Sequence, residues 1–213
     1  MRNAKRLPLE QLAPFLVDDP DEPIPLDGPR IFGNERPVEI EVGFGKGWFL
    51  VSAAQACPQT NFLGIEIMRK FQLYVAGRLV RNKLTNARVA RADARIFLRD
   101  HLPTSSVQAM HVYFPDPWWK KRHYKRRLFT AEFAAECGRV LQPGGLLHVV
   151  TDVADYFVVI RALLAERPEL ALEPVPEPGA PEHDLDYLTN FERKYRKEGR
   201  PIHRGCYRRR EST

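Results

Sequence analysis

The chain has 213 residues and a formal net charge of +6, with a pI near 9.3. A chain of this length can bury enough apolar surface for one large domain without a disulfide or metal staple. Its three cysteines, Cys57, Cys137 and Cys206, lie far apart, which argues against a disulfide framework and against a zinc site. No apolar run approaches the length of a membrane span. We therefore expect a cytoplasmic protein with no metal and no membrane partner, and the charge favours a polyanionic partner.

The predicted elements begin after an N-terminal arm. Residues 1–36 are rich in proline and charge, which predicts an arm that is partly ordered at most. Residues 37–213 form a single domain in which predicted strands and helices alternate. The predicted strands are 38–43, 61–67, 87–92, 107–114, 146–151, 170–175 and 202–209, and the predicted helices are 48–56, 69–84, 131–141, 154–165 and 190–198. This order predicts an α/β fold with a doubly wound, mostly parallel seven-stranded sheet and helices on both faces.

The first predicted strand runs into a glycine-rich loop with the sequence EVGFGKG (41–47). Alternate glycines, Gly43, Gly45 and Gly47, let a ligand approach the main chain closely. The dinucleotide fingerprint G-x-G-x-x-G would need a third glycine at position 48, where the chain has Trp48. An acid at position 41 repels a pyrophosphate but suits an amine or a sulfonium. The loop therefore disfavours a nucleotide-dependent oxidoreductase and favours S-adenosylmethionine (SAM) as cofactor.

Acids also end the second and third predicted strands. Glu66 is placed to accept hydrogen bonds from ribose hydroxyls, as acids at this point do in doubly wound sheets. Asp93 is placed to accept from the adenine amino group. The alternative for Glu41, Glu66 and Asp93 is that they are helix N-caps or surface acids. Their occurrence at three successive strand ends favours a cofactor site.

The fourth predicted strand opens into the segment FPDPWWKKRHYKRR (114–127). The two prolines hold Asp116 in one place because they fix φ and remove backbone donors. Two tryptophans and six Lys or Arg residues follow, which offer flat faces for bases and charges for phosphates. The alternative is a solvated basic loop in which Asp116 only forms the turn. Either tryptophan could stack on a base while the other packs against the fold. A second basic segment, residues 193–210, has Glu198 as its one acid.

These motifs resemble the bacterial tRNA (guanine-N7)-methyltransferases, which are SAM-dependent enzymes of Rossmann type. The resemblance covers roughly residues 38–205 and implies methyl transfer to N7 of a variable-loop guanine in tRNA. Trp119 and Tyr124 depart from it, since the family usually has proline and histidine at these places. The matching blocks are EVGFGKGWFL (41–50), GIE (64–66), ADA (92–94), FPDPWWKKRHYKRR (114–127), PGG (143–145), TD (151–152) and TNFERKYRKEGRPI (189–202).

The resemblance also implies residue roles. It makes Asp116 the catalytic or SAM-contacting residue. The implied substrate-binding residues are Lys120, Asp152, Thr189, Asn190, Phe191 and Glu192, and the implied RNA-binding residues are Arg122, His123, Tyr124, Lys125, Arg126 and Arg127. Thr189 and Glu192 also have the spacing of a capping box, which gives them a purely structural alternative.

The chemistry of guanine N7 fits this set of residues. N7 has a free lone pair and carries no proton, so methyl transfer needs positioning and no general base. The purine ring becomes cationic, and a carboxylate such as Asp116 would stabilise that charge. A SAM enzyme that acts on another base and a nucleic-acid-binding module that holds no SAM remain the alternatives. A monomer and a homodimer are both compatible with the sequence.

Overall fold

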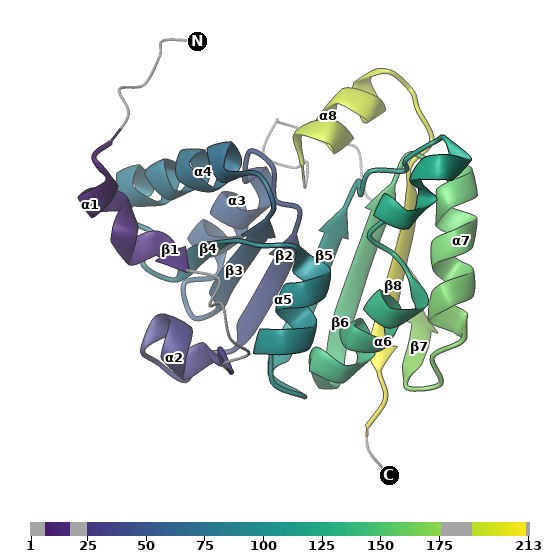
Figure 1. The fold of residues 1–213 in the computed structure, drawn as a ribbon, viewed down its shortest axis with the longest axis horizontal. Helices are drawn as coiled ribbons and strands as arrows, with labels where there is room; N and C mark the ends of the chain where they lie inside the picture. The colour runs from purple at the N-terminus through teal and green to yellow at the C-terminus, as the bar shows by residue number, and fades with distance from the viewer. Residues whose placement is uncertain (1–6, 18–24, 176–188, 212–213) are drawn as a thin grey trace.

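The computed structural model describes residues 7–17, 25–175 and 189–211. They form one sheet in the order β1-β4-β3-β2-β5-β6-β8-β7 (Figure 1). The strands are β1 (Leu16–Val17), β2 (Val38–Val42), β3 (Asn61–Glu66), β4 (Ala87–Arg91), β5 (Val107–Tyr113), β6 (Leu141–Thr151), β7 (Leu170–Glu173) and β8 (His203–Arg209). The helices are α1 (Leu9–Leu12), α2 (Gly28–Phe32), α3 (Trp48–Ala56), α4 (Arg69–Asn82), α5 (Ala94–His101), α6 (Ala131–Val140), α7 (Ala154–Ala165) and α8 (Asn190–Lys197), with 3-10 turns η1 (Ala13–Phe15) and η2 (Lys121–Arg126).

The predicted fold class is confirmed, but the predicted number of strands is wrong. The sheet has eight strands, because β1 of the N-terminal arm pairs with β4 in parallel. All strands from β1 to β6 pair in parallel, and β8 pairs antiparallel with β6 and β7. The strand order reverses at β2, which lies between β3 and β5. Ligands of doubly wound sheets bind at the carboxyl edge of such a switch point.

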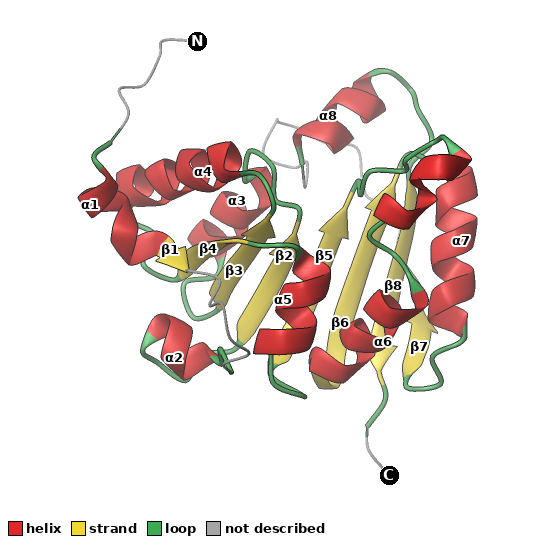
Figure 2. Ribbon diagram, in the orientation of Figure 1, coloured by secondary structure: helices red, strands yellow, loops and turns green. Residues whose placement is uncertain are grey.

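Two apolar cores lie on the two faces of the sheet. On one face, α3 and α4 contribute Leu50, Val75 and Leu79 to a core that includes Phe62 of β3. On the other face, α5, α6 and α7 pack on the sheet in a second core, and Figure 2 shows α5 and α6 in front of the strands. Alternate residues of β2 face opposite ways, so Ile40 belongs to the second core while Glu41 points to the side of α3.

Two segments differ from the prediction for local reasons. Helix α5 was not predicted, although its buried residues Ala94, Phe97, Leu98 and His101 have helical spacing. Strand β6 begins at Leu141, five residues before the predicted start, and continues through the Pro-Gly-Gly sequence. Its pairing with β5 shifts register between Val107 and Ala109, so the glycines form an irregular part of the strand. No described helix is long and apolar enough to cross a membrane.

Candidate active site

The glycine-rich loop after β2 is shaped by left-handed backbone and by side chains from neighbouring elements. Gly43, Gly45 and Gly47 have φ of 75°, 49° and 63°, which residues with a Cβ rarely adopt. A Cβ on Gly47 would lie 2.6 Å from Cγ2 of Val75 in α4, whereas the space beside Gly43 and Gly45 is open. The loop therefore packs on α4 at one end and leaves room for a ligand at the other.

Glu41 lies beneath this loop and is buried. Its Oε2 accepts a hydrogen bond of 3.1 Å from the Leu50 N–H in the first turn of α3, so it also acts as a helix cap from another element. Burial raises the pKa of Glu41 from 4.5 to about 8, and the nearby Glu66 adds to the increase. The carboxyl is therefore protonated at neutral pH until a cation approaches it.

Glu66 ends β3, Asp93 follows the end of β4 by two residues, and both already have partners. Glu66 accepts from the backbone N–H of Gly45 at 3.1 Å and of Met68 at 3.0 Å. Asp93 caps α5 and binds the Arg95 side chain through both oxygens, at 3.1 and 2.6 Å. The hydrogen bond from Arg95 lowers the pKa of Asp93. A pocket of about 330 Å³ is lined by Ile67, Arg91, Ala92 and Asp93, so Asp93 combines the capping role with a place beside a cavity.

The Asp116 turn is held in a strained conformation at the end of β5. Phe114 and Trp118, on either side of Pro115-Asp116-Pro117, have φ of 53° and 45°, and such left-handed non-glycine residues gather at functional sites. The Phe114 N–H donates to Val150 O of β6 at 2.7 Å. Arg127 Nε donates to Pro117 O at 2.8 Å. These two bonds tie both sides of the turn to the fold.

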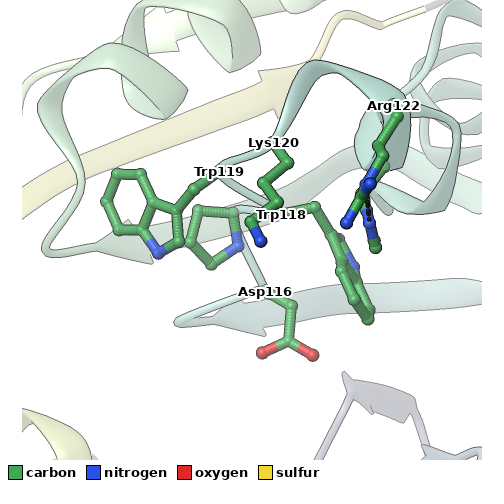
Figure 3. Close-up of a pocket in the computed structure, with 7 residues that line it drawn as sticks. Asp116, Trp118, Trp119, Lys120 and Arg122 are labelled. Carbon is green, nitrogen blue, oxygen red and sulfur yellow. Dashed lines mark hydrogen bonds between the residues drawn. The ribbon is translucent and has the colours of Figure 1, made fainter.

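An open pocket of about 460 Å³ is lined by Asp116, Pro117, Trp118, Trp119, Lys120, Arg122 and His123. Figure 3 shows the Asp116 carboxylate and the Trp118 ring extending to the same side of the loop, with Trp119 pointing away from Trp118. Asp116 is exposed and makes no hydrogen bond to the described part of the chain. Trp119 is 69% exposed. Trp118 stacks on His123 with ring centroids 5.8 Å apart, beneath the Arg126 guanidinium at 5.0 Å.

Not every predicted RNA-binding cation points to solvent. Arg122, Tyr124, Lys125 and Arg126 are exposed. Arg127 is half-buried and lies over the rings of Tyr124 and Tyr156, at 3.7 and 4.7 Å. Together with its bond to Pro117, this placement makes Arg127 part of the scaffold of the loop.

Helix α8 lies across the same edge of the sheet. Thr189 caps it by accepting from the Glu192 N–H at 3.0 Å, and Glu192 is buried and binds Arg204 of β8 at 2.6 Å. Phe191 and Tyr195 approach Phe114 with ring centroids 5.9 and 5.5 Å apart. Thr189 therefore has the capping role that its spacing allowed, while the Glu192 carboxylate binds Arg204, and α8 carries aromatic rings against the start of the Asp116 turn.

The remaining predicted substrate residues are Asp152, Lys120 and Asn190. Asp152 follows β6 and is 3.8 Å from Arg200, which comes after α8. Lys120 lines the pocket beside Asp116. The backbone of Asn190 begins α8.

Comparison with known proteins shows to which protein family this chain belongs. The family model described as "Putative methyltransferase" matches residues 35–205. A tRNA (guanine-N(7)-)-methyltransferase of Rhodopirellula baltica is 42% identical, over 95% of this chain and 77% of that protein. The protein of the same name from Alkalilimnicola ehrlichii is 37% identical, over 95% of this chain and 86% of that protein. The chain belongs to the tRNA (guanine-N(7)-)-methyltransferase family.

Solved methyltransferases have the same fold as this family member. The 16S rRNA methyltransferase KamB matches with a TM-score of 0.60 at 16% identity, over 85% of this chain and 91% of that chain. The aminoglycoside resistance methyltransferase NpmB1 matches with a TM-score of 0.56 at 22% identity, over 84% and 89%. The predicted family and enzyme class are thus confirmed, and the residue roles within the tRNA (guanine-N(7)-)-methyltransferase site remain predictions.

Two side-chain networks of the structure were not predicted from the sequence. Arg78 of α4 donates from Nη1 to the carbonyls of Lys46 and Gly47, at 2.8 and 2.9 Å, and so braces the glycine-rich loop. On β5, the buried His111 lies 2.8 Å from Glu39 and 2.9 Å from the Tyr113 hydroxyl. A histidine in the middle of the apolar strand VQAMHVY was the available signal for this second network, whereas nothing local pointed to Arg78.

Proposed function

We propose that this protein transfers a methyl group from SAM to N7 of a guanine in tRNA, in the variable loop, and so forms 7-methylguanosine. One observation carries the proposal. The glycine-rich loop with its buried acid and the strained Asp116 turn follow β2 and β5, which are neighbours in register from Glu39↔Ala109 to Val42↔Val112. Because these strands are adjacent and parallel, a methyl donor at one strand end and a base at the other would meet.

The residues around the glycine-rich loop fit SAM. The open space beside Gly43 and Gly45 admits a ligand against the main chain. Glu41 supplies a buried carboxyl for the cationic part of the cofactor, and Glu66 and Asp93 lie at the next two strand ends for the ribose and the adenine. Bound SAM supplies an electrophilic methyl group. The protein's contribution is to orient it and to keep water away from it.

Asp116 is the residue that we propose to act at the guanine. The turn fixes its carboxylate beside Lys120 and Trp118, in the pocket at the end of β5. There it can accept hydrogen bonds from the N–H edge of the guanine and offset the positive charge that the ring gains. Because N7 has no proton to lose, no side chain has to act as a general base.

Exposed cations surround this pocket and suit a nucleic acid. Lys121, Arg122, Lys125 and Arg126 are exposed around η2, and α8 adds basic residues in its last turn. Phosphates would bind these charges, while Trp119 offers a free ring for a base. A tRNA-modifying enzyme of this kind would work in the cytoplasm, as a monomer or a homodimer.

The direct test is to incubate the purified protein with unmodified tRNA transcript and SAM and to identify the modified nucleosides by mass spectrometry. The proposal expects 7-methylguanosine at one variable-loop position. If another methylated nucleoside formed, the proposed cofactor would stand and the proposed target, guanine N7, would be wrong. Failure to bind SAM in a thermal-shift titration would overturn the methyltransferase function itself.

A further inference from the structure

Exposed cations also gather on the cofactor half of the sheet edge, away from the Asp116 loop. Lys46 lies in the glycine-rich loop after β2, Arg69 and Lys70 begin α4 after β3, and Arg91 ends β4. All four side chains are exposed. Because β2, β3 and β4 are parallel neighbours, their carboxyl ends lie at one edge, and these four residues form a row along it. We call this row the cofactor-side rim.

The charges of the cofactor-side rim are not neutralised within the protein. None of the four residues forms an ion pair with any residue that the structure describes. The acids nearby are already engaged, since Glu66 accepts from two backbone N–H groups and Asp93 binds Arg95. Arg69 and Lys70 also occupy the first turn of α4, which has no acid and where the helix dipole disfavours positive charge. The rim therefore costs the fold some stability.

The proposed cofactor does not account for these charges. SAM is itself a net cation at neutral pH, so a row of unpaired cations around its site would oppose its binding. Its one carboxylate could engage a single member of the rim and would leave the others unexplained. A polyanion that passes over the cofactor site would account for all four, because phosphates release counterions when they bind Lys and Arg.

We propose that the cofactor-side rim binds backbone phosphates of the tRNA on the far side of the target guanine from the η2 loop. This inference rests on the proposed function and extends its RNA surface from β5 to β4. Three strand spacings separate β5 from β4, about 14 Å, which is the length of about four nucleotides along a stacked strand. The guanine would then enter the pocket between two anchored stretches of its own backbone.

The test compares charge-removing variants of equal size. R69Q/K70Q removes two rim charges on α4. K83Q/R161Q removes two exposed charges elsewhere, because Lys83 follows the far end of α4, about 21 Å from its start, and Arg161 lies on α7. K46Q tests the rim from a second element. For each variant, binding of unmodified tRNA transcript is measured by fluorescence anisotropy between about 50 and 200 mM salt, and SAM binding is measured by calorimetry.

The proposal expects R69Q/K70Q to weaken tRNA binding and to reduce the slope of log K against log salt by about 1.4 to 1.8, with a reduction about half as large in K46Q. K83Q/R161Q should keep the wild-type slope, and SAM affinity should stay unchanged in R69Q/K70Q and in K83Q/R161Q. A wild-type salt slope in both rim variants would overturn the proposal that the rim binds tRNA phosphates, and would leave the proposed methyltransferase function intact. A loss of SAM affinity with an unchanged tRNA slope would assign the rim to the cofactor carboxylate instead. If the wild-type protein formed no 7-methylguanosine and bound no tRNA, both the proposed function and the proposed phosphate binding by the rim would be wrong.

Discussion

At the scale of single residues, the Asp116 turn combines a strained backbone with an exposed carboxylate. Left-handed φ values at Phe114 and Trp118 cost free energy of order 1 to 3 kcal/mol each. Bonds from Phe114 to Val150 and from Arg127 to Pro117 maintain this geometry. The carboxylate itself stays exposed, which is the arrangement that the proposed role of Asp116 at the guanine requires.

Asp116→Asn tests the charge of this carboxylate. The amide keeps the shape of the turn but cannot offset a cationic ring, so we expect kcat to fall about a hundredfold while the KM values for SAM and tRNA change little. Single-turnover kinetics with quantification of 7-methylguanosine measures the effect. If turnover in this variant stayed near the wild-type value, the Asp116 charge would have no catalytic role and the residue would only form the turn.

The two tryptophans should separate into different roles. Trp119 is 69% exposed, so Trp119→Ala should weaken tRNA binding by about 1 to 3 kcal/mol, as loss of a stacked base does, without changing the melting temperature. Trp118 contacts both His123 and Arg126, so Trp118→Ala should lower the melting temperature. Paired thermal-shift and anisotropy measurements distinguish them, and equal tRNA affinity for wild type and Trp119→Ala would exclude stacking by that ring.

At the scale of elements, α8 connects the sheet to the Asp116 turn. Its buried Glu192 binds Arg204 of β8, and its aromatic rings lie on Phe114. The Arg193 guanidinium lies 5.5 Å from the Trp48 ring at the start of α3. One short helix therefore touches both the segment that follows β5 and the helix that follows the glycine-rich loop.

Thr189→Ala removes the cap of α8, and Thr130→Ala provides a matched control. Thr130 caps α6 with the same type of bond, to the Phe133 N–H at 3.2 Å, whereas the rings that lie on Phe114 belong to α8. Each variant should lose about 1 kcal/mol of stability. Only Thr189→Ala should also raise the KM for tRNA, because fraying of α8 loosens the rings on Phe114. Equal KM values in the two variants would restrict Thr189 to a structural role.

Helix bounds were predicted best where turn signals flank an apolar segment. Helix α3 and helix α7 have the predicted bounds, because apolar residues and turn signals agree along them. Strand β1 could not be predicted, since two residues, Leu16 and Val17, gain strand geometry only by pairing with β4. The strand-end positions of Glu41, Glu66 and Asp93 follow from the alternation of elements. The capture of Asp93 by Arg95 depends on side-chain geometry that no sequence pattern encodes.

At the scale of the whole molecule, a single buried carboxyl links stability to pH. Glu41 has its usual pKa of 4.5 in the unfolded chain and a pKa raised to about 8 in the folded one. The folded state therefore holds a proton that the unfolded state has released at intermediate pH. The contribution of Glu41 to stability is fully present below pH 4.5 and declines as pH rises to about 8.

The affinity for SAM should change with pH in the opposite direction to the stability, because the cationic SAM favours the ionised carboxylate of Glu41. We expect SAM affinity to rise by up to tenfold for each pH unit below about 8 and then to level off. Calorimetric titration of wild type and Glu41→Gln across this range measures the dependence. The Gln variant should bind SAM weakly and with a flat pH profile, and a wild-type profile in that variant would show that another group titrates.

The bracing of the glycine-rich loop by Arg78, Glu41 and Glu66 has a consequence for turnover. A loop that is already held by Arg78 and Glu66, and that leads into a helix whose first turn is bound by Glu41, should gain little further order when SAM binds, so binding is not opposed by the entropy of folding the loop. The demethylated product has the same adenosine and amino-acid parts and would find the same rigid cradle. In the proposed binding mode, the demethylated product differs from SAM at Glu41 only by the loss of the methyl group and the sulfonium charge. We therefore expect the demethylated product to inhibit the enzyme, so that turnover depends on how fast this product is removed.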